Sequence, residues 1–239
     1  MWLALETAGD RASVAVGETF EDAVEESLLG SRRHAGALLP MVTAALAGRG
    51  VALDAITGIL VSDGPGSFTG LRVGASVGKA LARARDLPLY TAPSLVVRAA
   101  GVADRDGRLV LAVSDALRGD VYAAAVRFAR GRVRVELDPG VWRPDDLAAL
   151  DLRPDVLVGE APAPVMAELE RWTRRPVVSP PAGAPRAARL IELATLDGGA
   201  RRVEDPQAWE PVYGRPAEAQ ARWETAHGRP LPNSVGGPR

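Results

Sequence analysis

Residues 62–74 read Ser-Asp-Gly-Pro-Gly-Ser-Phe-Thr-Gly-Leu-Arg-Val-Gly. They follow residues 55–62, Ala-Ile-Thr-Gly-Ile-Leu-Val-Ser, a nearly uninterrupted apolar run of the kind found in a strand covered on both faces. After the glycine-rich turn, the apolar spacing from Phe68 to Ala84 indicates a helix. The sequence therefore predicts a buried strand, a tight turn and a helix in direct succession.

A glycine-rich turn before a helix presents free backbone N–H groups, which in many proteins hold a phosphate. Residues 74–80 are not a Walker loop, because three residues instead of four separate the two glycines and alanine follows the lysine. The first three glycines have the spacing GxGxxxG, which also departs from the Rossmann fingerprint. An autonomous phosphate loop is therefore the weaker interpretation of this turn.

Glycines recur every four residues along this helix, at Gly70, Gly74 and Gly78. Each interior glycine lowers helix stability by about 1 kcal/mol relative to alanine, so a flank of glycines needs a compensating contact. The close approach of another backbone supplies one. Either the helix lies tightly on its own sheet, or it pairs with a helix of a second molecule. Aromatic, apolar and arginine anchors for such a pair stand at the start of the helix: Phe68, Leu71 and Arg72.

Apolar patterns and turn residues divide the whole chain into two halves of β-β-β-α-β-α type. In each half the order is strand, strand, strand, helix, strand, helix, strand, helix. In the first half these segments are residues 2–5, 12–16, 20–28, 35–47, 55–62, 68–84, 87–91 and 94–103. In the second half they are residues 109–114, 121–128, 132–137, 145–150, 156–158, 165–172, 177–178 and 186–196. We therefore predict a duplicated α/β fold with subdomains 1–104 and 105–225, and a disordered tail at 226–239.

The composition is that of a soluble globular protein, with 47% apolar and 25% charged residues. The absence of cysteine excludes disulfides, thiol catalysis and thiolate metal sites. A formal net charge of −1 provides no global field for nucleic acid or an anionic membrane, so any RNA contact is expected to be local or made by a partner. The N-terminus lacks a secretion signal and no apolar run reaches ~18 residues, so we expect a cytoplasmic protein without membrane contact.

Metal-binding and hydrolase motifs are missing. The two histidines, His34 and His227, are too far apart in sequence to form an HxxxH or HExxH pair. Ser67 or Ser114 as a nucleophile would have only His34 as its histidine, which argues against a serine hydrolase. The basic segment 31–34, Ser-Arg-Arg-His, either contacts RNA phosphates or forms a solvated turn.

Two carboxylates occupy equivalent places in the two halves. Glu6 ends the first strand, and Asp115 ends the first strand of the second half. Carboxylates at such strand ends could face a cleft and hold a hydrated Mg ion with nucleotide phosphates. Equally, they could be ordinary turn acids that cap neighbouring N–H groups.

Four segments together closely resemble the TsaB family, also called YeaZ. They are Leu3–Thr7, Ser31–Pro40, Gly64–Gly74 and Asp115–Tyr122. The third segment is highly specific for the family, and the spacing of all four fits. The resemblance covers residues 1–125 firmly and the remainder loosely, with residues 211–216 similar to a degraded copy of the family's C-terminal motif.

This resemblance implies a duplicated actin-like ATPase (ASKHA) fold and a role in making threonylcarbamoyladenosine beside the tRNA anticodon in bacteria. It implies a non-catalytic subunit that pairs with the metal-bearing paralogue TsaD, while the ATPase TsaE joins them and tRNA is met only through the complex. The pairing is implied to use the two N-terminal helices of each subunit, and the free protein could form a homodimer. Carried onto this sequence, the interface residues are Leu38, Leu39, Met41, Val42, Phe68, Leu71, Arg72, Gly74, Ala75 and Gly78.

The resemblance implies no cofactor of the chain's own, although ATP or ADP with Mg could bind at a shared interface. The nucleotide-binding residues would then be Glu6, Asp115 and Arg118. Three departures from the family pattern bear on this: Glu6 replaces a common aspartate, Leu117 a usual arginine and Gly214 a leucine. They put contacts with nucleotide or with the third subunit in doubt, but not the helix bundle.

Two other functions remain as alternatives. One is a stand-alone actin-fold ATPase or phosphotransferase with Glu6 and Asp115 around Mg-ATP, although neither acid lies in the phosphate motif such kinases carry. The other is a chaperone-like protease, for which the sequence offers neither cysteine nor a Ser/His/Asp arrangement.

Overall fold

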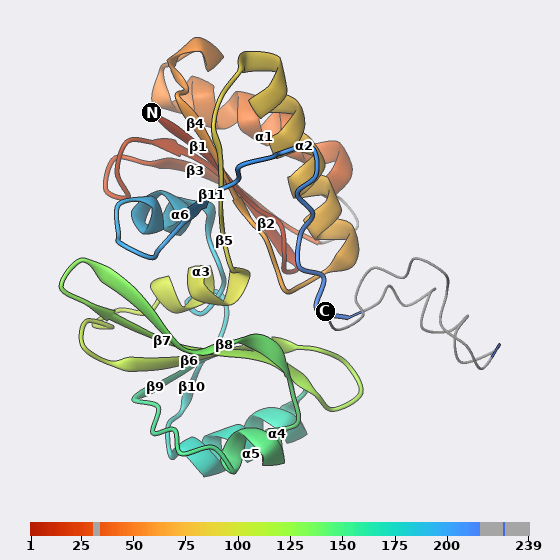
Figure 1. The fold of residues 1–239 in the computed structure, drawn as a ribbon, viewed down its shortest axis with the longest axis vertical. Helices are drawn as coiled ribbons and strands as arrows, with labels where there is room; N and C mark the ends of the chain where they lie inside the picture. The colour runs from red at the N-terminus through yellow and green to blue at the C-terminus, as the bar shows by residue number, and fades with distance from the viewer. Residues whose placement is uncertain (31–33, 216–226, 228–239) are drawn as a thin grey trace.

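The computed structural model describes residues 1–30, 34–215 and 227. The strands form two β-sheets. Figure 1 shows helices on the outer side of each sheet and further helices between the sheets. Over the first sheet lie α1 (His34–Arg49) and α2 (Phe68–Arg85). Over the second lie α4 (Pro144–Ala148) and α5 (Ala163–Thr173). The inner helices are α3 (Ser94–Ala100) and α6 (Ala187–Ala194).

The first sheet has the strand order β11-β5-β4-β1-β2-β3. Strands β1, β2 and β3 form an antiparallel meander, while β4 and β5 run parallel to β1. The strands are β1 (Trp2–Glu6), β2 (Arg11–Gly17), β3 (Val24–Leu29), β4 (Gly58–Ser62), β5 (Leu89–Ala92) and β11 (Arg201–Arg202).

The second sheet has the order β10-β9-β6-β7-β8. Its meander is β6 to β8, and β9 and β10 run parallel to β6. The strands are β6 (Leu109–Asp115), β7 (Val121–Ala129), β8 (Arg132–Trp142), β9 (Val156–Glu160) and β10 (Val177–Val178). Apart from β11, the two sheets have the same strand order and directions, which confirms the predicted duplicated actin-like architecture.

The predicted element order is confirmed, but several boundaries differ. Strand β3 begins at Val24 and not at residue 20, because Asp22 accepts the N–H groups of Glu18 and Thr19 at 2.9 and 2.8 Å and holds a turn there. Strand β4 begins at Gly58 because Leu53–Ala55 forms a short 3-10 helix, η2. Strand β8 extends to Trp142 through irregular pairing with β7.

The halves exchange helices. Helix α3, from the first half of the sequence, packs on β6 and β7, whereas α6, from the second, packs on β1 and β2. Strand β11, which the sequence analysis missed, then extends the first sheet. Helix α6 and strand β11 therefore lie against the first sheet, and the predicted subdomain division stays a prediction.

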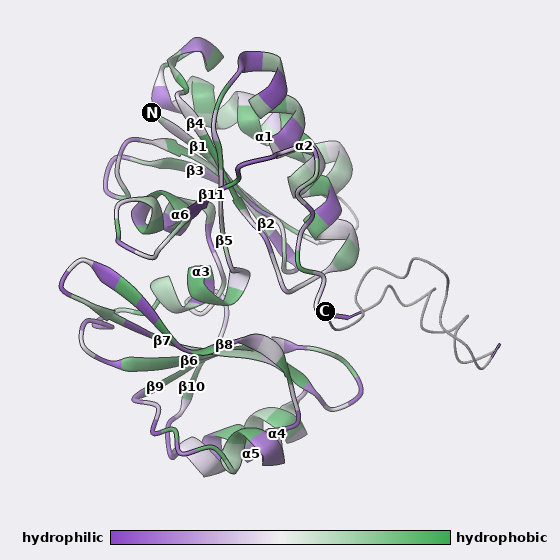
Figure 2. Cartoon of the chain, viewed as in Figure 1, coloured by the Kyte–Doolittle hydropathy of each residue, from purple (hydrophilic) through white to green (hydrophobic). Residues whose placement is uncertain are grey.

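Apolar residues fill three layers of this arrangement. Figure 2 shows hydrophobic segments along the strands of both sheets. The middle layer packs α3 and α6 between the sheets, around residues such as Leu60, Leu95 and Leu190. The outer layers pack α1 and α2 on the first sheet, and α4 and α5 on the second. This core leaves two places for function, namely the outer helices and the region between the halves.

Candidate functional site

The glycine flank of α2 faces the chain's own sheet. A Cβ atom at Gly70 would lie 2.0 Å from the Thr7 carbonyl oxygen, and one at Gly74 would lie 2.4 Å from Thr7 Oγ1. A Cβ at Gly78 would lie 2.6 Å from Val61 Cγ2. The Thr7 hydroxyl also donates a hydrogen bond of 2.8 Å to the Gly70 carbonyl. Of the two alternatives for this flank, the own-sheet packing is therefore correct, and pairing with a second molecule through the glycines is wrong.

The predicted interface residues divide into two groups by accessibility. Those buried within this chain are Leu38, Val42, Leu71, Gly74, Ala75 and Gly78. The accessible ones are Leu39, Met41, Phe68 and Arg72. The first group fills the space between the helices and the sheet, so it can support an interface but does not form its surface.

The outer face of α1 is free of charge. Its buried side chains, including Leu38 and Val42, pack on the first sheet. The exposed residues of the helix are Ala35, Gly36, Leu39, Pro40, Thr43, Ala44, Ala47 and Gly48. Helices facing water normally expose charged residues, whereas this one exposes small and apolar ones, with Leu39 at 55%. This surface has the composition of one that another protein covers.

Helix α2 continues this surface on the side next to α1. Partly buried Val73, Val77 and Leu81 pack against the same apolar cluster as α1. Beside them, the exposed residues up to the basic end of the helix are Thr69, Arg72, Ser76 and Ala80. We call the exposed residues of α1 from Ala35 to Gly48, together with these residues of α2, the α1–α2 face. Sequence reasoning missed most of it, although the absence of any charged residue between His34 and Arg49 was visible.

The carboxyl group of Glu6 is sealed inside the protein. Glu6 is fully buried at the end of β1, and this burial raises its pKa to about 7. The Ala8 N–H, which donates to its Oε1 at 2.7 Å, and the neighbouring Ser62 hydroxyl offset the shift only in part. Nearby Arg98 is also buried and donates to the Gly183 carbonyl at 2.7 Å. Because its side chain is fully buried, Glu6 does not present an oxygen at the protein surface.

The other two predicted nucleotide residues lie on the turn between β6 and β7. The Asp115 carboxylate accepts the N–H of Leu117 at 2.8 Å and thus caps its own turn. Arg118 is exposed, and both Leu117 and Arg118 have positive φ angles. Among the described hydrogen bonds and ion pairs, none joins Glu6 to Asp115 or Arg118. The nucleotide expectation for these residues therefore stays a prediction.

A segment near the C-terminus packs against α2 and the glycine-rich turn. Lys79 of α2 forms an ion pair of 3.3 Å with Glu210, and the rings of Phe68 and Tyr213 lie 4.7 Å apart. The positive φ of Gly214 lets the backbone pass beneath the Tyr122 ring, where a Cβ would approach to 2.5 Å. The close approach to Tyr122 therefore explains how glycine fits at position 214, where the family pattern has leucine.

The structure does not describe some residues for which the sequence made predictions. The basic segment 31–33 and the tail, apart from His227, lie outside the described residues, as does the side chain of His34. Within the described residues, no three His, Cys, Asp or Glu side chains gather as metal ligands do. No helix in the same residues is long and apolar enough to cross a membrane.

Comparisons with known proteins agree with this architecture. Residues 17–170 match the family model described as TsaD, tRNA N6-adenosine threonylcarbamoyltransferase. The tRNA threonylcarbamoyladenosine biosynthesis protein TsaB of Bacillus subtilis is 30% identical over 80% of this chain and 83% of its own length. The TsaB of Escherichia coli is 33% identical over 65% of this chain and 63% of its own.

A solved structure matches over almost its whole length. YeaZ from Pseudomonas aeruginosa superposes with a TM-score of 0.72 and 29% identity, and the match covers 89% of this chain and 98% of that one. The sequence motifs, the duplicated fold and these relatives agree, and the chain belongs to the TsaB (YeaZ) family.

Proposed function

We propose that this chain is a non-catalytic partner subunit that activates the threonylcarbamoyltransferase TsaD in the synthesis of threonylcarbamoyladenosine in tRNA. Its family membership supports the pathway. The sequence has no HxxxH pair, the motif that the metal-bearing paralogue TsaD uses in this family. In this proposal TsaD performs the transfer, a TsaE-like ATPase joins the complex, and tRNA contacts this chain only through the assembly.

The observation that carries the proposal is the α1–α2 face, whose exposed residues are uncharged except for Arg72. Small side chains such as Gly36, Ala44 and Ala80 allow the backbone of a partner helix to approach closely. Leu39 and Pro40 add exposed apolar area that association would remove from water. A related subunit with two similar helices would complete a four-helix bundle on this face.

The proposed mechanism of activation is conformational. Covering the α1–α2 face stabilises the TsaD conformation that binds substrate, because this chain has a higher affinity for that conformation than for the inactive one. No group of this chain then needs to touch the reacting atoms. The sealed position of Glu6 is consistent with such a role.

The proposal is tested by placing a charge in the middle of the face. Ala44→Arg leaves the core untouched because Ala44 is exposed on α1, but it buries an unpaired charge in the complex. We expect TsaD to be lost from co-purification and tRNA modification to fall to the level seen without this chain. The matched control is Ala167→Arg on α5, the corresponding outer helix of the second half. Unchanged binding and activity with Ala44→Arg would refute the proposal.

The stand-alone ATPase remains the alternative function. Calorimetry of the isolated protein with Mg-ATP separates the two, because tight binding and turnover without TsaD would favour the enzyme. The sealed Glu6 favours the partner-subunit proposal. Size-exclusion chromatography with and without TsaD shows whether a homodimer uses the same face, since TsaD would then dissociate it.

A further inference from the structure

The chain crosses from the first half to the second in its last described residues. After β11, the segment runs along α2 and ends near the turn between β6 and β7 (Figure 1). Sequence patterns gave no indication of this path, because the segment has no periodic apolar residues. Its residues 212–215 contact both halves within four positions.

The contacts with the first half are numerous and mostly buried. The Val212 N–H donates to the Asp63 carbonyl at 2.7 Å, directly before the glycine-rich turn. Tyr213, only 5% exposed, packs on Phe68, and the Arg72 guanidinium lies 4.7 Å from the centre of the same Phe68 ring. Residues 212–213 therefore hold the start of α2, including two accessible residues of the predicted interface.

The contacts with the second half are fewer, and besides the packing of Gly214 against the Tyr122 ring they are polar. The Arg215 guanidinium forms an ion pair with the Asp120 carboxylate, and about a quarter of each side chain remains exposed. The Tyr122 hydroxyl donates a long hydrogen bond of 3.4 Å to the Tyr213 carbonyl. Partly exposed ion pairs are typically worth about 1 kcal/mol or less. If this segment releases one half, it will release the second half and stay on α2.

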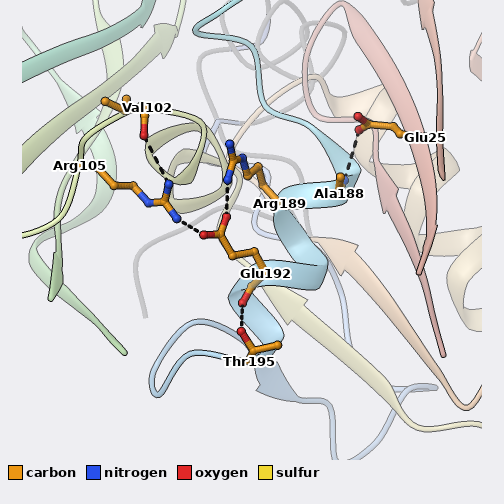
Figure 3. A network of polar contacts seen from close by, with 7 residues as sticks. All are labelled: Glu25, Val102, Arg105, Ala188, Arg189, Glu192 and Thr195. Carbon is orange, nitrogen blue, oxygen red and sulfur yellow. Dashed lines mark hydrogen bonds and ion pairs between the residues drawn. The ribbon is translucent and has the colours of Figure 1, made fainter. Parts of the chain in front are cut away.

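A separate network joins the halves where the two inner helices meet (Figure 3). Glu192 on α6 forms an ion pair with Arg105, which follows α3, and this pair crosses between the halves. The contact of 2.6 Å between Glu192 and Arg189 lies within α6. In Figure 1, α6 lies on the left and the end of residues 212–215 lies on the right. The halves are thus joined by the α3–α6 core and the Arg105–Glu192 pair on one side, and by the Arg215–Asp120 pair on the other, which is an arrangement suited to hinge motion.

We propose that residues 212–215 are a latch that holds the two halves together on the side away from Glu192, with Arg215 as the positioning residue. When the Arg215–Asp120 pair breaks, the second half turns away about the Glu192 network. Tyr213 then loses the contact with Tyr122 that fixes it against Phe68, so the start of α2 shifts. The relative orientation of the halves therefore changes the surface that a partner on the α1–α2 face contacts. This last step rests on the proposed function.

The latch is tested first on the isolated chain, independently of any partner. The protein has no cysteine, so Ala84→Cys on α2 and Ala167→Cys on α5 introduce one exposed spin-label site in each half. We expect a single narrow distance distribution by electron paramagnetic resonance. Arg215→Asp should broaden it and shift it to longer distances, and the swapped pair Arg215→Asp with Asp120→Arg should restore it.

The matched control is Arg132→Asp, which breaks an exposed ion pair of 2.7 Å with Asp197 outside the latch. It should leave the distance distribution unchanged. Thermal unfolding by circular dichroism shows that each variant is folded at the temperature of the measurement. An unchanged distribution in Arg215→Asp would overturn the latch.

The coupling to the partner is tested with TsaD and tRNA. We expect Arg215→Asp to bind TsaD with less than about a threefold change in affinity and to lower the modification rate of the complex about fivefold or more, within the usual range of coupling between sites. The swapped pair should recover the rate. If the wild-type chain does not bind TsaD, the proposed function fails while the spin-label result still decides the latch. If distances change and the rate does not, the coupling is overturned.

Discussion

The outer helices of the two halves occupy corresponding places in a duplicated fold but present different surfaces. On α1 every exposed residue from Ala35 to Gly48 is uncharged. On the second half, α4 exposes Asp145 and Asp146, and α5 exposes Arg171. The fold alone therefore does not require an uncharged outer helix, because the second half forms the same architecture with an ordinary hydrated surface. This difference is the basis of the proposal that a partner covers the α1–α2 face.

The largest expected effect concerns the inner side of α2. Gly74→Leu places its Cβ only 2.4 Å from Thr7 Oγ1, so we expect the free energy of unfolding to fall by about 3 kcal/mol or more. On the outer helix of the second half, Ala167→Leu is exposed and should change it by less than about 0.5 kcal/mol. Urea denaturation measures both. Equal stability of the two variants would show that the glycine flank is not packed on the sheet.

The second-largest expected effect is a pH dependence of stability that comes from Glu6, at the end of β1, and not from the corresponding strand end of the second half. Because burial raises the pKa of Glu6 from 4.5 to about 7, the folded protein binds more protons than the unfolded chain between these pH values. The free energy of unfolding should therefore decrease as pH rises from 4.5 to 7. Glu6→Gln removes this decrease and should stabilise the protein at pH 8 by up to about 3 kcal/mol.

Urea denaturation at pH 4.5, 6 and 8 measures this effect. Asp115→Asn, at the corresponding strand end on a partly exposed turn, is the control and should keep the pH dependence of the wild type. The same pH dependence in Glu6→Gln as in the wild type would show that Glu6 is not sealed.

The smallest expected effect is at the rim of the α1–α2 face. Arg85 at the end of α2 forms an ion pair of 2.6 Å with the well-exposed Asp54. Such a surface pair contributes little, so Arg85→Ala should lower the free energy of unfolding by less than about 1 kcal/mol and TsaD affinity by less than about fivefold. Thermal unfolding and a binding titration check both values. A loss of TsaD affinity as large as that expected for Ala44→Arg would show that the centre of the TsaD contact lies nearer this end of α2.

Periodicity predicted the order of elements well because long apolar patterns dominate them. Helix α2 was expected at residues 68–84 and observed at Phe68–Arg85. Strand β11 was missed because it consists of two exposed arginines, whose pairing with β5 depends on the path of the chain and not on a local pattern. The exchange of α3 and α6 was missed because an apolar helix face does not indicate which of two sheets it covers.

The sequence predicted a close contact along α2, but it did not show which side of the helix makes this contact. The spacing of Gly70, Gly74 and Gly78 indicates a close contact, but a glycine flank looks the same whether a sheet or a partner lies against it. The structure places Thr7 and Val61 there. The more informative signal was negative, namely the lack of charge along α1. The sealing of Glu6 depends on side chains distant in sequence, such as Arg98, and no local motif reports it.

The most direct measurement is a map of where TsaD covers this chain. Hydrogen exchange followed by mass spectrometry, with and without TsaD, compares the outer helices of both halves in one experiment. The central claim predicts slower exchange in residues 35–49 and 68–81 on adding TsaD, with residues 163–173 unchanged. Protection confined to residues 163–173, or equal exchange in both helices of the first half, would contradict it.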